Sequence, residues 1–186
     1  IQIALLPCPA MNPGQPNNPP AVTIYDKIKG LYYPNPIVDT VYAGQYVEIE
    51  FTGVDNDFDA SLAIADPSSG GFQRIVLDAS GNAFGTNFSS TTTGCPITPC
   101  AILDPPAPTV PAPFGTISTL KWQTTCDHLG FTNGCVSFQN VYTFIIKVFD
   151  DFCPAPGISV NTVKVVLLAP PQLEAPKIKC TDVEPN

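Results

Sequence analysis

Apolar and polar residues alternate along several short runs of the chain, a pattern typical of β-strands with one buried face. In residues 46–51 the apolar side chains of Val47, Ile49 and Phe51 would share one face. Residues 141–149 are mostly β-branched or aromatic, so we interpret this run as a central strand buried on both faces. The other strands that the pattern predicts cover residues 21–25, 60–64, 72–77, 116–124 and 160–168.

About seven short strands suit a β-sandwich. The composition agrees, because 22 prolines and 13 glycines interrupt helices and punctuate turns. Charged residues make up 13 % of the chain, about half the usual share, which leaves few side chains for the solvated faces of amphipathic helices. We therefore predict an all-β fold, an immunoglobulin-like β-sandwich of about seven strands, with residues 79–114 as a long loop insertion that contains a disulfide.

Proline-rich segments suggest how the chain is divided. We assign the sandwich to residues 18–169 and a linker toward a following domain to residues 170–186. Residues 1–17 have two interpretations, because Ile1–Leu6 resembles Val163–Leu168 and each is followed by prolines. They are either the end of a preceding tandem domain or an N-terminal strand plus linker. The chain reads as a segment of a longer secreted protein, and no apolar run is long enough to cross a bilayer.

The net charge of −8 restricts the partners. Binding of nucleic acid needs a basic surface, and the chain has one arginine, so nucleic acid is disfavoured as a partner. Insertion into a membrane and binding to anionic membrane surfaces are disfavoured as well. An acidic excess is instead compatible with calcium, or simply with solubility.

The run Asp55-Asn56-Asp57-Phe58-Asp59 places oxygen ligands at alternate positions, as a calcium loop does. It departs from the EF-hand pattern, because Ala60 stands where that loop needs a glycine and the predicted flanking elements are strands. A self-contained calcium loop is therefore not expected.

A sandwich offers a second way to assemble such a site. If residues 46–54 are strand B and residues 141–149 strand F, the loops that follow them lie at one end of the domain. The carboxylates of Asp150 and Asp151 would then join those of the 55–59 run. We predict that calcium binds there and stiffens the junction with a neighbouring domain; the alternative is an ordinary solvated turn, since Asp and Asn favour turns. The candidate metal ligands are Asp55, Asp57, Asp59, Asp150 and Asp151.

Seven cysteines accompany a single histidine. Zinc sites use close Cys or Cys/His pairs, and Cys95 and Cys100 have no second close pair to complement them. Disulfides formed in an oxidising compartment explain the cysteines better. From the expected positions of the loops we predict the pairs Cys95–Cys100, Cys126–Cys135 and Cys8–Cys153, with Cys180 left to pair elsewhere.

The remaining candidates for chemistry are few. His128 lacks the sequence context of a catalytic triad, so we interpret it as a loop histidine without a catalytic role. Trp122 is either a core anchor or a platform on which a sugar stacks, and its place in an alternating strand favours the core. A carbohydrate-binding module is the alternative function, and its aromatic platform would come from Tyr32, Tyr33, Phe84, Phe88, Phe114 and Phe131.

Three parts of the chain resemble the immunoglobulin-like repeats of giant Bacteroidetes cell-surface proteins. They are the closing runs 142–154 and 163–168, the opening Asn18-Pro19-Pro20, and Ala43-Gly44-Gln45 before a strand followed by an acidic turn. Those proteins include gliding-motility adhesins of the SprB type and other type IX secretion substrates, and residues 179–186 resemble the start of a fibronectin-type domain.

The resemblance implies export to the cell surface and a non-enzymatic structural or adhesive role. It implies one bead of a tandem surface filament whose partners are neighbouring domains, a surface polysaccharide or another surface protein.

Overall fold

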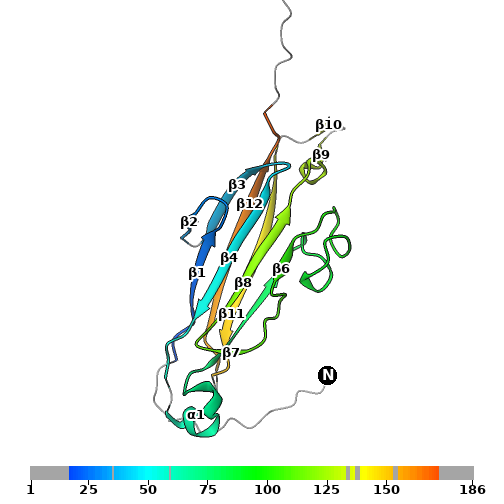
Figure 1. Ribbon diagram of the computed structural model, residues 1–186. Coiled ribbons are helices and arrows are strands. Elements are labelled where there is room, and N and C mark those ends of the chain that lie inside the picture. The colour runs from blue at the N-terminus through cyan, green and yellow to red at the C-terminus, as the bar shows by residue number, and fades with distance from the viewer. Residues whose placement is uncertain are drawn as a thin grey trace, which may run out of the picture.

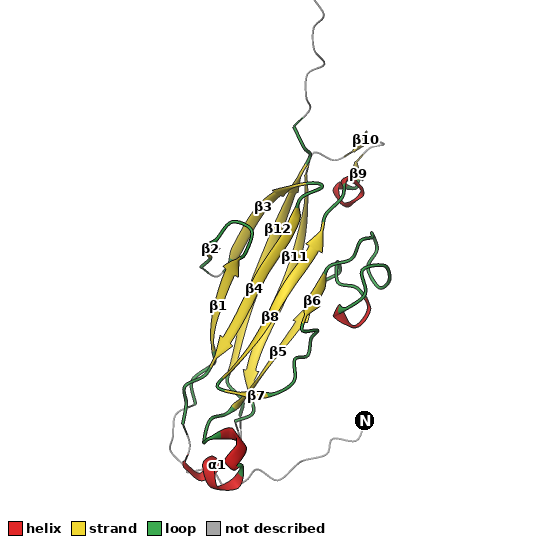
Figure 2. Ribbon diagram, in the orientation of Figure 1, coloured by secondary structure: helices red, strands yellow, loops and turns green. Residues whose placement is uncertain are grey.

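Two five-stranded β-sheets pack face to face in the computed structural model (Figures 1 and 2). The structure describes residues 17–34, 36–58, 60–132, 135–136, 139–152 and 155–171. Short helical segments lie outside the sheets, and α1 lies beyond the lower end of the sheets in Figure 2. The helical segments are α1 (Ala60–Ala65), η1 (Pro67–Ser69), η2 (Thr86–Phe88) and η3 (Cys126–Leu129), and β9 (Phe131–Thr132) and β10 (Cys135–Val136) form a separate two-stranded ladder.

The first sheet has the order β2-β1-β4-β8-β6 and is antiparallel throughout. Its longest ladder joins β4 and β8, in which Phe51 lies opposite Ser118. Alternate residues of β4 face inward, so the predicted inward positions Val47, Ile49 and Phe51 are confirmed. The strands are β1 (Ala21–Asp26), β2 (Leu31–Tyr32), β4 (Tyr46–Val54), β6 (Ile102–Asp104) and β8 (Gly115–Gln123).

The second sheet has the order β3-β12-β11-β5-β7. Its edge strand β3 pairs in parallel with β12, and the register places Ile37 beside Val163 and Tyr42 beside Leu168. The other pairs are antiparallel. The strands are β3 (Ile37–Tyr42), β5 (Arg74–Ser80), β7 (Ala112–Pro113), β11 (Gln139–Asp150) and β12 (Ile158–Leu168).

This strand order confirms the immunoglobulin-like sandwich. Strands β1, β4, β8 and β6 occupy the places of A, B, E and D, and β5, β11 and β12 occupy those of C, F and G. The chain leaves the first sheet after β2 and joins the second sheet as β3. The predicted strands B and F are confirmed at β4 and β11.

The core lies between the inner faces of the sheets. Trp122 from β8 is 1 % exposed, and its ring centroid lies 4.8 Å from that of Tyr142 and 5.9 Å from that of Phe144, both on β11. Aromatic rings from opposite sheets therefore interlock edge to face, the geometry that their quadrupoles favour. The interpretation of Trp122 as a core anchor is confirmed.

Two predictions about strands are wrong. Strand β11 buries one face only, because its burial alternates and Val141 and Ile145 on the other face are 47 % and 41 % exposed. Residues 60–65 form helix α1 instead of a strand. Half of that helix is alanine, which has the highest helix propensity, and it has no place in either sheet's order.

The predicted insertion, residues 79–114, is more ordered than a loop. It contributes β6 to the first sheet and β7 to the second, and Phe84 bridges Ala101. The predicted disulfide Cys95–Cys100 is present. The indole Nε1–H of Trp122 donates a hydrogen bond of 3.0 Å to the carbonyl oxygen of Pro99, which ties this region to the core.

We expect neighbouring residues of β11 to differ sharply in their effect on stability. Phe144→Ala should lower the free energy of unfolding by about 3–5 kcal/mol, because a fully buried ring is replaced by a cavity. Thr143→Ala, on the exposed face, should change it by less than about 0.5 kcal/mol. Urea unfolding of the two variants measures the difference, and similar losses in both would show that β11 is buried on both faces after all.

Candidate functional site

Two clusters of polar side chains lie at different places in the sandwich, and each contains two buried carboxylates. The first, the acidic pole, consists of Asp55, Asp57, Asp150 and Asp151. Strand β4 ends at Val54 and β11 ends at Asp150, so the loops after them meet at one end of the domain as predicted. Burial chiefly raises the pKa of Asp55, and the charge of Asp150 across the pole adds to the rise.

The carboxylates of the acidic pole accept hydrogen bonds from chain segments that converge there. Asp150 accepts from the backbone N–H of Phe152 and of Gly157, each at 2.9 Å, and from the side-chain amide of Asn17 at 3.2 Å. Asp57 accepts from the backbone N–H of Asn18 at 2.7 Å. The pole therefore fixes the segment that leads into β1 against the loop between β11 and β12.

Asp55 is the least satisfied member of the acidic pole. One of its oxygens accepts from the N–H of Asp57 at 2.8 Å, while the other, Oδ2, is buried without a hydrogen-bond partner. Burial raises the pKa of Asp55, and the charges of Asp57 and Asp150 raise it further. Burial also raises the pKa of Asp150, although its backbone donors oppose the shift. Relative to a free aspartate, the folded chain thus shifts both groups toward the protonated form.

The calcium site stays a prediction. Among the residues that the structure describes, no group of three or more His, Cys, Asp or Glu side chains is arranged to hold a metal ion. Asp59 lies outside the described residues, and Asp151 accepts the backbone N–H of Arg74 at 2.9 Å. The described carboxylates act as acceptors for the chain's own N–H groups, which fits the alternative interpretation of this run as a turn.

The raised pKa of Asp55 predicts how its contribution to stability depends on pH. The folded state binds this proton more tightly than the unfolded state, so the contribution is fully present below the unfolded pKa of about 3.9 and is lost as the pH rises through the folded pKa. As the pH rises from about 4 to 7, the unfolding free energy of the natural chain should therefore fall relative to that of Asp55→Asn. Denaturant titrations across this range measure it, and a difference that is constant or moves the other way would contradict the assignment.

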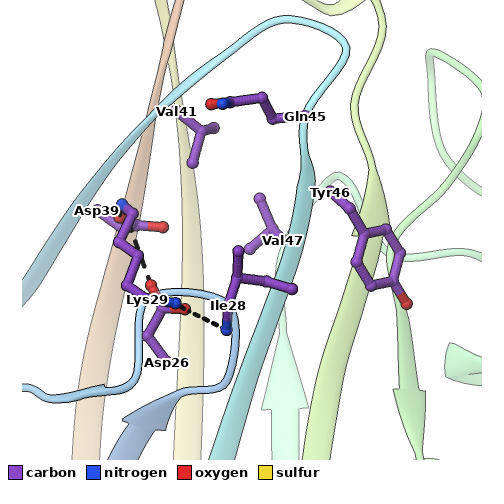
Figure 3. A pocket seen from close by; sticks show the side chains of 8 residues that line it. All are labelled: Asp26, Ile28, Lys29, Asp39, Val41, Gln45, Tyr46 and Val47. Carbon is purple, nitrogen blue, oxygen red and sulfur yellow. Dashed lines mark hydrogen bonds and ion pairs between the residues drawn. The ribbon is translucent and has the colours of Figure 1, made fainter.

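The second cluster, the inter-sheet polar cluster, consists of Asp26, Lys29, Tyr33 and Asp39 (Figure 3 shows three of the four). Asp26 ends β1 in the first sheet and Asp39 lies in β3 of the second, and each is 2 % exposed. The Lys29 ammonium contacts Asp39 Oδ1 and lies 4.0 Å from Asp26 Oδ2. A cavity of about 340 Å³ adjoins the cluster; it is lined by Asp26, Ile28, Lys29, Asp39, Val41, Gln45, Tyr46 and Val47.

Tyr33 and the turn after β1 complete the hydrogen bonds of this cluster. The backbone N–H groups of Ile28 and Lys29 donate to Asp26 Oδ1 at 2.9 and 2.8 Å. The Tyr33 hydroxyl lies 3.1 Å from Asp26 Oδ2 and 3.4 Å from Asp39 Oδ1. Burial, together with the charges of Asp39 and Asp26, raises the pKa of Tyr33, so its hydroxyl remains a proton donor.

Sequence reasoning missed this cluster, although one signal was present. In the run from Ile37 to Val41 every second side chain faces inward, and Asp39 takes the inward position between the apolar Ile37 and Val41. A carboxylate at an inward position needs a partner, and Lys29 and Tyr33 lie close in sequence.

One of the three predicted cysteine pairs is confirmed, and the other two are not tested. Cys95–Cys100 is confirmed, with a Cα–Cα distance of 5.6 Å. Cys126 is exposed and carries a free thiol in the structure, while the side chain of Cys135 lies outside the description, so that pair stays a prediction. Cys8, Cys153 and Cys180 also lie outside the described residues.

The side chain of His128 is buried against other side chains and is not accessible at the surface. It is 1 % exposed, its Nδ1 accepts from the backbone N–H of Thr125 at 3.0 Å, and its ring lies 4.9 Å from that of Trp122. Burial lowers the pKa of His128, so the ring is neutral at pH 7. These contacts assign His128 to the core at the end of the sandwich.

The aromatic residues suggested for a sugar platform are scattered. Phe84 is 5 % exposed and packs on Phe144, with centroids 5.0 Å apart. Tyr32 pairs with Tyr25 on the first sheet, and Phe114 pairs with Phe72, with centroids 3.9 Å apart. Phe88 packs partly buried against the core, Tyr33 belongs to the inter-sheet polar cluster, and the side chain of Phe131 is not described.

Comparisons with known proteins add little to this description. No protein-family model and no curated protein matches the sequence. Among solved structures, the CooA pilin subunit from enterotoxigenic Escherichia coli aligns over 82 % of this chain and 100 % of its own, with 12 % identity and a TM-score of 0.32. AggA, the major subunit of aggregative adherence fimbriae type I from Escherichia coli, aligns over 84 % of this chain and 99 % of its own, with 10 % identity and the same TM-score.

Scores this low carry no argument about the chain. In the described residues, no helix has the length and apolarity needed to cross a membrane. The fold assignment therefore rests on the chain's own strand order.

Proposed function

We propose that this domain is a non-enzymatic structural module of an extracellular surface protein, one of several domains joined in series. The observation that supports it most is where the described chain enters and leaves. Asn17 and Asn18 are fixed at the acidic pole, beside Asp150 and Asp57. Strand β12 runs from that pole to the opposite end, where the carbonyl of Leu168 accepts the N–H of Ala43 at 2.8 Å.

The two described ends of the chain therefore lie at opposite ends of the long axis of the sandwich (Figure 1). At about 3.3 Å per residue, β12 alone spans roughly 35 Å. Domains of this geometry extend a filament when they are joined end to end, because each linker leaves from the pole opposite to the one where the chain entered.

The parallel pair of β3 and β12 suits a domain that carries load. A force on the two ends acts first on β1, which pairs with β4. Once β1 yields, the force draws the start of β3 toward the acidic pole and the end of β12 away from it. The six residue pairs from Ile37–Val163 to Tyr42–Leu168 would then be sheared, and their hydrogen bonds would share the load. If the same ladder were peeled from one end, its bonds would break one after another.

Export to the cell surface is part of the proposal. It is supported by the cysteine content, the disulfide at Cys95–Cys100 and the resemblance to repeats of Bacteroidetes surface proteins. The partners are then the neighbouring domains of the same chain, with a surface polysaccharide or another surface protein as the target of the filament. The scattered positions of the candidate platform aromatics favour this function over carbohydrate binding.

A single-molecule experiment tests the load-bearing role. We expect the domain to resist a clearly higher force when it is pulled through its two ends than when it is pulled through handles at residues 42 and 168. The second geometry loads the same pair of strands from adjacent positions at one end and peels them apart.

Both arms use the same folded protein, with handles attached through azide-bearing residues so that the natural cysteines are not involved. Equal unfolding forces in the two geometries would contradict the proposed role.

A further inference from the structure

The inter-sheet polar cluster contains the groups needed to form a covalent bond between the two sheets. Lys29 follows β1 of the first sheet, and Asp39 lies at an inward position of β3 in the second sheet. The Lys29 ammonium nitrogen contacts Asp39 Oδ1 and donates to the carbonyl of Thr40 at 3.0 Å. The amine nitrogen and the carboxyl group are thus held against each other, with the Asp39 side chain 2 % exposed and the Lys29 side chain 35 % exposed.

A second carboxylate stands beside this pair. Asp26 Oδ2 lies 4.0 Å from the Lys29 nitrogen, and the side chains of Asp26 and Asp39 are 3 % and 2 % exposed. Two buried carboxylates therefore share one ammonium group. As a purely ionic arrangement this is costly, because the desolvation of buried charges has to be compensated and one negative charge has no counter-ion within the cluster.

We propose that Lys29 and Asp39 condense to an intramolecular amide bond, with Asp26 as the catalytic proton carrier. The bond between Lys29 Nζ and Asp39 Cγ forms, and one of the two Cγ–Oδ bonds breaks. Of the three ammonium hydrogens one stays on the amide nitrogen, and the other two leave with the released oxygen as water. The ammonium and carboxylate charges cancel, so the step is balanced without an oxidant, a reductant or a co-reactant.

Each neighbouring group has a part in this step. Asp26 takes a proton from the attacking nitrogen and delivers it to the departing oxygen of Asp39, and it is unchanged at the end. The Tyr33 hydroxyl, 3.4 Å from Asp39 Oδ1, is placed to donate to the oxygen on which negative charge develops. The backbone N–H groups of Ile28 and Lys29 hold Asp26 in position through its other oxygen.

The fixed contact between the two groups makes the condensation feasible. Amide formation from a free amine and a free acid is unfavourable in water, but groups held in contact react with effective molarities of about 10⁵–10⁸ M. The adjoining cavity gives the released water a place to leave the site.

Such a bond would join the two sheets of the sandwich. In antibody domains, the two sheets are joined covalently by a disulfide between strands B and F. The disulfide of the described residues, Cys95–Cys100, instead joins positions five apart in the predicted insertion. An amide between Lys29 and Asp39 would close the open side of the sandwich where the chain changes sheets. The inference does not depend on the proposed mechanical function.

Mass spectrometry of the folded, purified chain tests the proposal. With disulfides reduced, the denatured natural chain should be lighter than its sequence mass by one water molecule. Trypsin should fail to cut after Lys29, because its amine is acylated. The expected product is a peptide from Ile28 to Arg74, lighter by one water, since no other Lys or Arg lies between Lys29 and Arg74.

Three variants separate the roles of the residues. Lys29→Arg keeps the charge but removes the amine, and Asp26→Ala leaves both reacting groups in place while removing the proton carrier; both should show the full sequence mass. Lys27→Arg is the matched control, since Lys27 pairs with Glu48 and Glu50 on the first sheet and should leave the water loss intact.

Two results would overturn the proposal. One is a natural chain with the full sequence mass. The other is a loss of water confined to a peptide that begins at Gly30, which would indicate a cyclised aspartate and a free Lys29. Both readings come from the natural chain, so they hold even if a variant fails to fold.

Discussion

The change of sheets between β1 and β3 determines most of what is particular to this sandwich. Strand β1 belongs to the first sheet, and β3, eleven residues further on, pairs in parallel with β12 of the second. Because of this crossing, the inward-facing side chains of β1 and β3 meet at the same open edge of the core. It places Asp26 opposite Asp39, and it makes β3 the partner of the strand through which the described chain leaves.

The rest of the core is held by apolar contacts that any sandwich of this kind requires. Trp122 from the first sheet meets Tyr142 and Phe144 from the second, and these rings fix the distance between the sheets. The two polar clusters lie apart from this apolar centre, whereas His128 packs against Trp122. The acidic pole fixes the incoming segment, the inter-sheet polar cluster lies where the chain changes sheets, and the buried His128 lies at the far end of β8.

The sequence predicts the parts of this fold whose pattern is local. Val47, Ile49 and Phe51 alternate with polar residues, so β4 and its buried face follow from the side-chain periodicity of a strand. The same logic failed for β11, where Val141 and Ile145 are apolar although they face outward. It failed again at α1, because six residues rich in alanine, with one Leu and one Ile, can satisfy a short helix as well as a strand.

The candidate sites show the same division. That Asp55 and Asp150 meet at one pole followed from the order of strands B and F, which a topology supplies without side-chain detail. The pairing of β3 with β12 could not be predicted, because a parallel partner 126 positions away leaves no mark in local periodicity. The inter-sheet polar cluster depends on that pairing, and so it was visible in the sequence only as one misplaced aspartate, Asp39.

Amide hydrogen exchange followed by NMR tests the β3–β12 pairing most directly, since the proposed load path and the inter-sheet polar cluster both require it. If β3 is a true strand of the second sheet, the hydrogen-bonded amides of residues 37–42 should exchange as slowly as those of β12, by global unfolding. If those amides exchange as quickly as the turn at residues 27–30, β3 is not held by β12. The account of the crossing, and of what depends on it, would then be contradicted.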